Sequence, residues 1–157
     1  MVMKSIKYCP IPSSYVQQMR TSMQDETGHN LVPRVLKHRA LCRHCLSDGS
    51  LELPQILFSY RPFRENANPY AETGPVFVHE HCEAYANDSV FPPDIRTRKF
   101  LTVRAYSSRQ WMLSGHLVEG EKAEEKVEEL FKNPEVAFVH INDASTGCFF
   151  VEAMLKE

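Results

Sequence analysis

Residues 136–153 read VAFVHINDASTGCFFVEA, two runs rich in β-branched and aromatic side chains on either side of a polar segment. Such runs predict strands, and the segment Asp143-Ala144-Ser145-Thr146-Gly147 between them has the composition of a turn. We therefore expect Val136 to Ile141 and Cys148 to Ala153 to pair as an antiparallel hairpin. This hairpin makes an antiparallel sheet the expected centre of the fold.

Two other segments have the pattern of an amphipathic helix. The clearer one precedes the hairpin and runs from Glu121 to Lys132, where apolar side chains recur at i, i+4, i+7 and i+8. Asn133-Pro134 is expected to end it, because proline cannot continue a helix. The second helix is expected near the N-terminus, with Ser13 or Ser14 as its N-cap and its end at about Met23.

Further strands are expected before the hairpin, at Ile6 to Tyr8, Val35-Leu36, Ile56 to Tyr60, Val76 to His81, Phe100 to Tyr106 and Leu117-Val118. A polar loop is expected from Arg64 to Thr73, and a short helical turn from Pro92 to Arg98. Strands and helices do not alternate regularly, so repeated βαβ units are not expected. The predicted fold class is α+β, one domain over residues 1–157 with a mostly antiparallel sheet and two main helices.

Length and composition are those of an ordinary globular domain. The chain has 157 residues, 43% of them hydrophobic and 24% charged, which excludes a disordered chain and leaves room for one domain. With 18 basic and 20 acidic residues the formal net charge is -2, so we expect no nucleic-acid partner, which would require a concentrated basic surface.

The sequence also limits the expected location. No apolar run reaches the length of about 18 residues that a membrane span requires, and Lys4 and Lys7 interrupt the N-terminus before a secretory signal could form. We therefore expect a cytoplasmic protein with no membrane partner. The five cysteines are an odd number, so in a reducing compartment they are expected to stay free or to bind metal.

The most specific chemical pattern joins two short segments that are rich in cysteine and histidine. Cys42-Arg43-His44-Cys45 sets two thiols three residues apart in a polar turn, and His79-Glu80-His81-Cys82 follows at the end of an expected strand. Together they predict a tetrahedral metal site of Cys42, Cys45, His79 and Cys82, with His81 as the reserve ligand. Zinc is the expected metal, because thiolates and imidazole suit it. Four protein ligands indicate a structural site, since catalytic zinc keeps a position open for water.

Two other interpretations of the same cysteines stay open. The residues of both segments could be unlinked core or surface residues, because free cysteine often behaves as a small buried apolar side chain. Cys42 and Cys45 could also form a redox dithiol, although the pair does not open a helix after a strand as in thioredoxin-like proteins.

The expected hairpin supplies a second pair of reactive groups. His140 and Cys148 lie on its two strands, and a thiolate beside an imidazole can act as a nucleophile. The register decides whether they meet, because a slip of one residue puts them on opposite faces. The alternative is a buried cysteine and a hydrogen-bonded core histidine.

The middle of the chain has a basic and aromatic bias. It suggests a pocket for an anionic small molecule, whereas the simpler interpretation is solvated arginines and packing tyrosines. The residues concerned are Arg61, Arg96, Arg98, Lys99, Arg104, Tyr60, Tyr70 and Tyr106. No nucleophile elbow, phosphate-binding loop, dinucleotide fingerprint or zinc-protease motif occurs.

An ordered set of short motifs resembles a known family. The motifs are Cys42-Arg43-His44-Cys45-Leu46, Ser59-Tyr60-Arg61-Pro62-Phe63, Pro69-Tyr70-Ala71-Glu72, Gly74-Pro75-Val76-Phe77-Val78-His79, Arg104-Ala105-Tyr106 and the hairpin from His140 to Cys148. This set is similar to the bacterial domain-of-unknown-function family numbered 1203, and the resemblance spans roughly Val35 to Val151. It implies a small, stand-alone, single-domain bacterial protein, and the family carries no established activity, substrate or cofactor.

Three functional hypotheses follow from the sequence. The first is a non-enzymatic α+β domain, stapled by a structural zinc ion, that binds an unknown small molecule or protein in a binding or regulatory role. The second is a small enzyme with a thiol and histidine pocket near Tyr70, Arg104, His140 and Cys148. The third is a thiol redox or metal-responsive protein built on Cys42 and Cys45. Whether the protein is an enzyme stays open at this point, as does its oligomeric state.

Overall fold

The computed structural model describes residues 4–64 and 68–157. Residues 65–67 of the loop expected from Arg64 to Thr73, and the first three residues of the N-terminal segment, lie outside this part. The elements are, in order, β1 (Ile6–Cys9), α1 (Ser13–Ser22), β2 (Gln55–Tyr60), β3 (Gly74–His79), α2 (Pro93–Arg96), β4 (Phe100–Tyr106), β5 (Met112–Glu119), the 3-10 turn η1 (Gly120–Lys122), α3 (Ala123–Leu130), β6 (Phe138–Asp143) and β7 (Phe149–Leu155).

The strands form two antiparallel sheets. Five strands make the larger sheet in the order β1-β7-β6-β4-β5, and β2 pairs with β3 in the smaller one. Every pairing in the larger sheet is antiparallel, including that of the first strand with the last. The predicted α+β class, the mostly antiparallel sheet and the two main helices α1 and α3 are confirmed.

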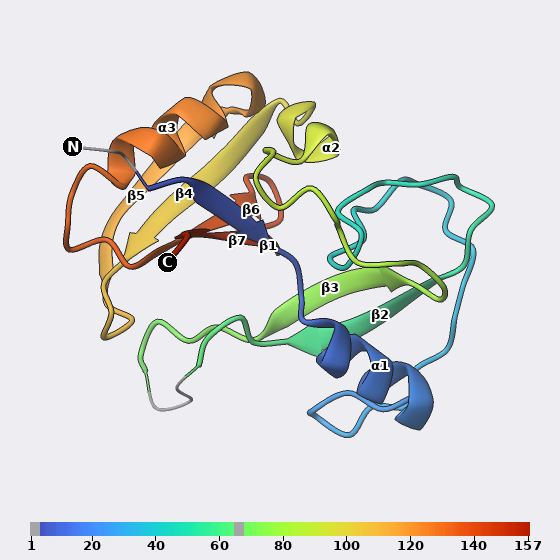
Figure 1. Cartoon of the computed structure of the whole chain (residues 1–157). Coiled ribbons are helices and arrows are strands. Elements are labelled where there is room, and N and C mark those ends of the chain that lie inside the picture. The colour runs from blue at the N-terminus through green and yellow to red at the C-terminus, as the bar shows by residue number, and fades with distance from the viewer. Residues whose placement is uncertain (1–3, 65–67) are drawn as a thin grey trace.

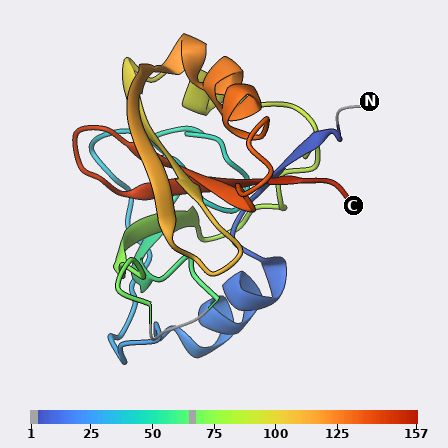
Figure 2. The same ribbon diagram turned by 90° about the vertical axis from the view of Figure 1, so that its left-hand side faces the viewer.

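The two sheets are stacked in layers between the two main helices (Figures 1 and 2). Helix α3 covers one face of the larger sheet, and its Ala123 and Val127 belong to a core that includes Val103 of β4. On the other side lie the β2–β3 sheet and α1, whose Val16 packs in a second core with Phe58. The larger sheet therefore has one face buried under α3 and one face turned toward the smaller sheet.

The predicted hairpin is present as β6 and β7, and a β-bulge sets its register. Ile141 lies opposite Val151 and His140 opposite Glu152, but Asn142 lies opposite Phe149, so Phe150 is the additional residue. The bulge lets the consecutive Phe150 and Val151 both join the core under α3, whereas Phe149 faces the smaller sheet.

Four predictions about the elements are wrong in detail. Val35-Leu36 is not a strand, because Pro33 cannot donate a backbone hydrogen bond and Val35 is 60% exposed; only Arg34 bridges to Gln55. The strand expected to reach His81 ends at His79, and the one expected at Leu117-Val118 extends from Met112 to Glu119. The first helix, α1, has Pro12 in place of a serine N-cap.

None of the described helices is long and apolar enough to span a membrane.

Candidate metal centre

The Cys42 to Cys45 segment is a tight turn that is closed by its own hydrogen bonds. Leu46 N donates to Cys42 O at 2.8 Å, and Cys45 N points to Cys42 Sγ at 3.5 Å. Leu46, next in the chain, takes the left-handed conformation with φ 58. This compact turn directs the Cys42 and Cys45 sulfurs toward the same region.

The turn lies beside the end of β3. Cys42 forms a parallel bridge with Phe77, and Arg43 N donates to Phe77 O at 2.9 Å. Two residues further along β3, His79 N donates to Cys42 Sγ at 3.2 Å. These backbone contacts join segments that are 37 residues apart and bring His79 to the two cysteines.

The side chains of Cys42, Cys45, His79 and Cys82 converge on one point. Their candidate ligand atoms all lie within 4.8 Å of one another. Cys42 Sγ is 3.7 Å from Cys82 Sγ, and Cys45 Sγ is 3.3 Å from His79 Nδ1. A tetrahedral zinc ion with its usual bond lengths separates two sulfurs by about 3.8 Å and a sulfur from a nitrogen by about 3.5 Å. These residues could therefore hold a metal ion, and the chemistry of the donors fits zinc.

The thiols of this cluster differ in their readiness to ionise. Hydrogen bonds from Cys45, Cys82 and His79 lower the pKa of Cys42, although its burial opposes the shift. The same hydrogen bonds to Cys42 raise the pKa of Cys45 and of Cys82. Cys42, the fully buried thiol, is therefore the first to become a thiolate.

Residues of α1 and of the turn surround the cluster with donors. Arg20 Nη2 donates to Cys82 Sγ at 3.2 Å and to His79 O at 2.6 Å. His44 Nδ1 is 3.3 Å from Cys82 Sγ, while its Nε2 bonds Ser13 Oγ at 3.0 Å. The Arg20 N–H thus gives the Cys82 sulfur a charged hydrogen bond that favours its thiolate, against the raising effect of Cys42 on the pKa of Cys82.

The fit of His79 depends on a glycine. Gly49 is in the left-handed region with φ +64, and a Cβ built on it would lie 2.6 Å from His79 Nε2. That nitrogen is buried with no hydrogen-bond partner among the described residues, so Nδ1 is the ring atom turned toward the cluster. Gly49 therefore leaves space for the imidazole behind the candidate ligand atom.

The prediction of His81 as the reserve ligand is wrong. Its side chain is 91% exposed and its Nε2 lies 4.0 Å from Glu80 Oε1, away from the cluster. The strand ends at His79, so the alternation expected to put both histidines on one face no longer holds at His81.

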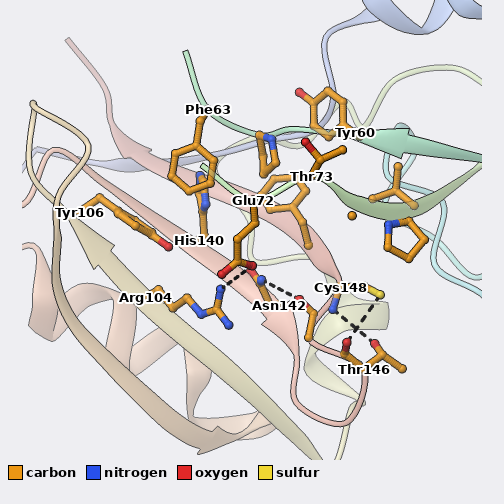
Figure 3. Close-up of a pocket in the computed structure, with 16 residues that line it drawn as sticks. Tyr60, Phe63, Glu72, Thr73, Arg104, Tyr106, His140, Asn142, Thr146 and Cys148 are labelled. Carbon is orange, nitrogen blue, oxygen red and sulfur yellow. Dashed lines mark hydrogen bonds and ion pairs between the residues drawn. The ribbon is translucent and has the colours of Figure 1, made fainter. Parts of the chain in front are cut away.

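A cleft lies at the edge of the face that the larger sheet turns toward β2 and β3 (Figure 3). Arg104, His140 and Cys148 line it, as the enzyme hypothesis requires, whereas Tyr70 packs beside it against Tyr106 and Trp111. The hypothesis that His140 and Cys148 face each other across the hairpin is wrong, because His140 lies opposite Glu152, four residues beyond Cys148. His140 Nε2 is 2.9 Å from Glu152 Oε2, and the Cys148 thiol is directed to Thr146 O.

Nearly three quarters of the chain matches one family model. The model, described as "Protein of unknown function (DUF1203)", covers residues 39–154. The chain belongs to this family. No curated protein and no solved structure matches it. The part matched to DUF1203 contains the four clustered residues and the residues that line the cleft, whereas Ser13 and Arg20 lie before it.

One hypothesis placed the basic residues of this DUF1203 chain around a single pocket for an anion. The structure does not bring them together. Arg98 pairs with Asp48, Arg96 pairs with Glu124 at 2.6 Å, and Arg61 donates to Thr73 at 3.0 Å. Lys99 lies over the Phe100 ring, so only Arg104 of the five lines the cleft. The basic residues are therefore engaged with different local partners.

Sequence reasoning on the DUF1203 chain missed Arg20 and His44 as neighbours of the cluster. His44 had a signal, because it stands between the two cysteines of the turn. Arg20 had none, since its contact with Cys82 joins residues 62 positions apart.

Proposed function

We propose that this protein binds one zinc ion through Cys42, Cys45, His79 and Cys82, and that the ion staples a non-enzymatic binding or regulatory domain. The observation that carries the proposal is the convergence of the four ligand atoms within 4.8 Å. Three thiolates and an imidazole form a donor set that favours zinc over magnesium or calcium, which prefer oxygen ligands.

A structural role suits this site better than a catalytic one. Four protein ligands complete a tetrahedral shell, whereas a catalytic zinc needs an open position for water. Three thiolates and a divalent ion leave one negative charge, which the Arg20 guanidinium beside Cys82 offsets. The described residues between α1 and the Cys42 to Cys45 turn form no strand or helix. The ion would fix this turn to the end of β3.

A redox role for Cys42 and Cys45 is less well supported. Reactive dithiols present an accessible thiol with a lowered pKa. Here the pKa is lowered for Cys42, chiefly by the hydrogen bond from Cys45, but its side chain is fully buried. The thiols nearer the surface, Cys45 and Cys82, have raised pKa values, since each donates toward Cys42.

We infer that the domain is bacterial and cytoplasmic and spans residues 1–157. The pairing of β1 with β7, from Ile6 with Leu155 to Cys9 with Glu152, supports one domain over the whole chain. Free thiols and a thiolate zinc site both suit a reducing cytoplasm.

Elemental analysis of the full chain, purified without added metal, tests the zinc proposal. About one zinc per chain is expected in the parent and none in Cys42→Ser or His79→Ala. Cys9→Ser and Cys148→Ser are the matched controls, because both cysteines lie outside the cluster, and they should keep the metal. A parent without metal, or a Cys42→Ser variant with a full complement of zinc, would contradict the proposal.

Gly49→Ala is expected to weaken zinc binding by about 10- to 100-fold, the usual cost of disturbing a residue that positions a ligand. The added Cβ would push the His79 ring out of place. A competition titration with a chromophoric chelator measures the affinity. Gly28→Ala is the control, because Gly28 is also left-handed, with φ +81, but a Cβ there meets nothing within 4 Å. Equal affinities in the two variants would show that the Gly49 contact is unimportant.

A further inference from the structure

The cleft of Figure 3 combines charged, polar and aromatic groups in a small volume. Its volume of about 230 Å³ is below the roughly 300–1,000 Å³ of sites for drug-sized ligands, so it suits a molecule of metabolite size. Strand β4 supplies Arg104, β6 supplies Asn142, and the loop before β3 supplies Glu72. The walls include the aromatic rings of Tyr60 and Phe63.

The arginine in this cleft has one long ion pair and lies beside the Tyr106 hydroxyl. Arg104 Nη1 and Glu72 Oε2 are 3.5 Å apart, at the limit of a hydrogen bond. The Glu72 side chain is 66% exposed on a loop, whereas that of Arg104 is only 23% exposed. Long, exposed ion pairs contribute little, so a carboxylate that binds the guanidinium with two parallel hydrogen bonds can replace Glu72.

One buried oxygen of a residue that lines the cleft lacks a hydrogen-bond partner among the described residues. Asn142 is 5% exposed, and its Nδ2 donates to Gly147 O at 3.0 Å, which sets the orientation of the amide and leaves Oδ1 unpartnered. Thr102 lies directly opposite Asn142 on β4 and does not line the cleft. Buried polar atoms nearly always have a partner, so a bound group with an N–H donor is expected at Asn142 Oδ1.

We propose that this cleft binds a free α-amino acid with an apolar or aromatic side chain. Its carboxylate binds Arg104, its ammonium donates to Asn142 Oδ1 and to Glu72, and its side chain packs against the aromatic wall. One cation and one anion set close together complement a zwitterion. A phosphate dianion is disfavoured, because it would face Glu72 with a single arginine to balance it. This inference does not depend on the zinc site.

NMR titration of the uniformly ¹⁵N-labelled, metal-loaded full chain tests the proposal. The probes are L-phenylalanine, L-leucine, 3-phenylpropionate, which lacks the ammonium, and phenethylamine, which lacks the carboxylate. We expect saturable shifts of the Thr102, Asn142 and Gly147 amides with an amino acid, and binding about 10- to 100-fold weaker for either analogue. No saturable shift at these amides up to about 10 mM of either amino acid, or equal affinity for 3-phenylpropionate and L-phenylalanine, overturns the proposal.

Two variants separate the roles of the charged groups. Arg104→Gln should weaken L-phenylalanine binding by about 10- to 100-fold, whereas Arg34→Gln, an exposed arginine on another surface, should leave it unchanged. Glu72→Gln should weaken L-phenylalanine binding but strengthen that of 3-phenylpropionate, because the competing carboxylate is gone. Strengthening of both probes in Glu72→Gln would overturn the ammonium contact. Zinc is quantified in each sample, so absence of amino-acid binding by the parent protein at full zinc content counts against this proposal and not against the zinc site.

Discussion

Under the proposed zinc assignment, removal of the ion is expected to lower the midpoint of thermal unfolding of this protein by about 10 °C or more. Structural zinc sites contribute apparent binding energies of about 10–16 kcal/mol, and part of that energy stabilises the fold. Even about 4 kcal/mol corresponds to about 8–16 °C in a domain of this size. The cause is local: the described residues between α1 and β2 contain no helix or strand, and the cluster holds the end of this segment against β3.

The measurement compares melting curves of the protein as purified with those of protein unfolded in chelator and refolded without metal. Cys42→Ser should melt close to the metal-free parent, and Cys148→Ser close to the parent with metal. Cys148 is a suitable control because it lies outside the cluster, and its thiol is directed to Thr146 O. If the metal-free and metal-bound parents melt within about 2 °C of each other, the ion does not stabilise this fold.

Arg43→Met is expected to lower the free energy of unfolding by about 2–4 kcal/mol. Arg43 is buried beside the candidate metal ligand Cys42, where its Nε donates to Phe149 O at 2.7 Å and its Nη1 to Leu41 O at 2.6 Å. Its guanidinium also lies 4.8 Å from the Phe150 ring centre. Methionine keeps much of the volume but leaves both carbonyl oxygens buried without donors, and this desolvation cost is the expected loss.

Urea unfolding of the metal-loaded protein measures this change. The exposed Arg34→Met should stay within about 0.5 kcal/mol of the parent, because its side chain is on the surface. Burial lowers the pKa of Arg43 to about 10, so the guanidinium is still charged at neutral pH. A loss below about 1 kcal/mol for Arg43→Met would mean that water or a shifted backbone satisfies the two carbonyls.

Local pattern was enough to predict most elements of this fold. The strand at Phe100–Tyr106 was predicted with its observed bounds, and α3 and the β6–β7 hairpin were predicted within a few residues. Periodic apolar side chains and breakers such as Pro134 act over a few residues, so their effect is visible in the sequence. The strand predicted at Val35-Leu36 is absent because these residue types alone do not make a strand. The segment has no neighbouring strand to pair with along its length.

The sequence by itself also named the four residues of the cluster, since two cysteines three apart and a histidine and cysteine three apart are local patterns. It could not place Arg20 or exclude His81, because those outcomes depend on where α1 docks and where β3 ends.

Only the tertiary structure decided which partner each group meets. His140 lies opposite Glu152, four residues beyond Cys148, so its Nε2 meets the Glu152 carboxylate and not the Cys148 thiol. The cleft exists because β4 and β6 turn Arg104 and Asn142 toward a loop from the smaller sheet. Register and the stacking of sheets are set by contacts between residues far apart in the chain. Hydrophobic periodicity is a local property and does not specify these contacts.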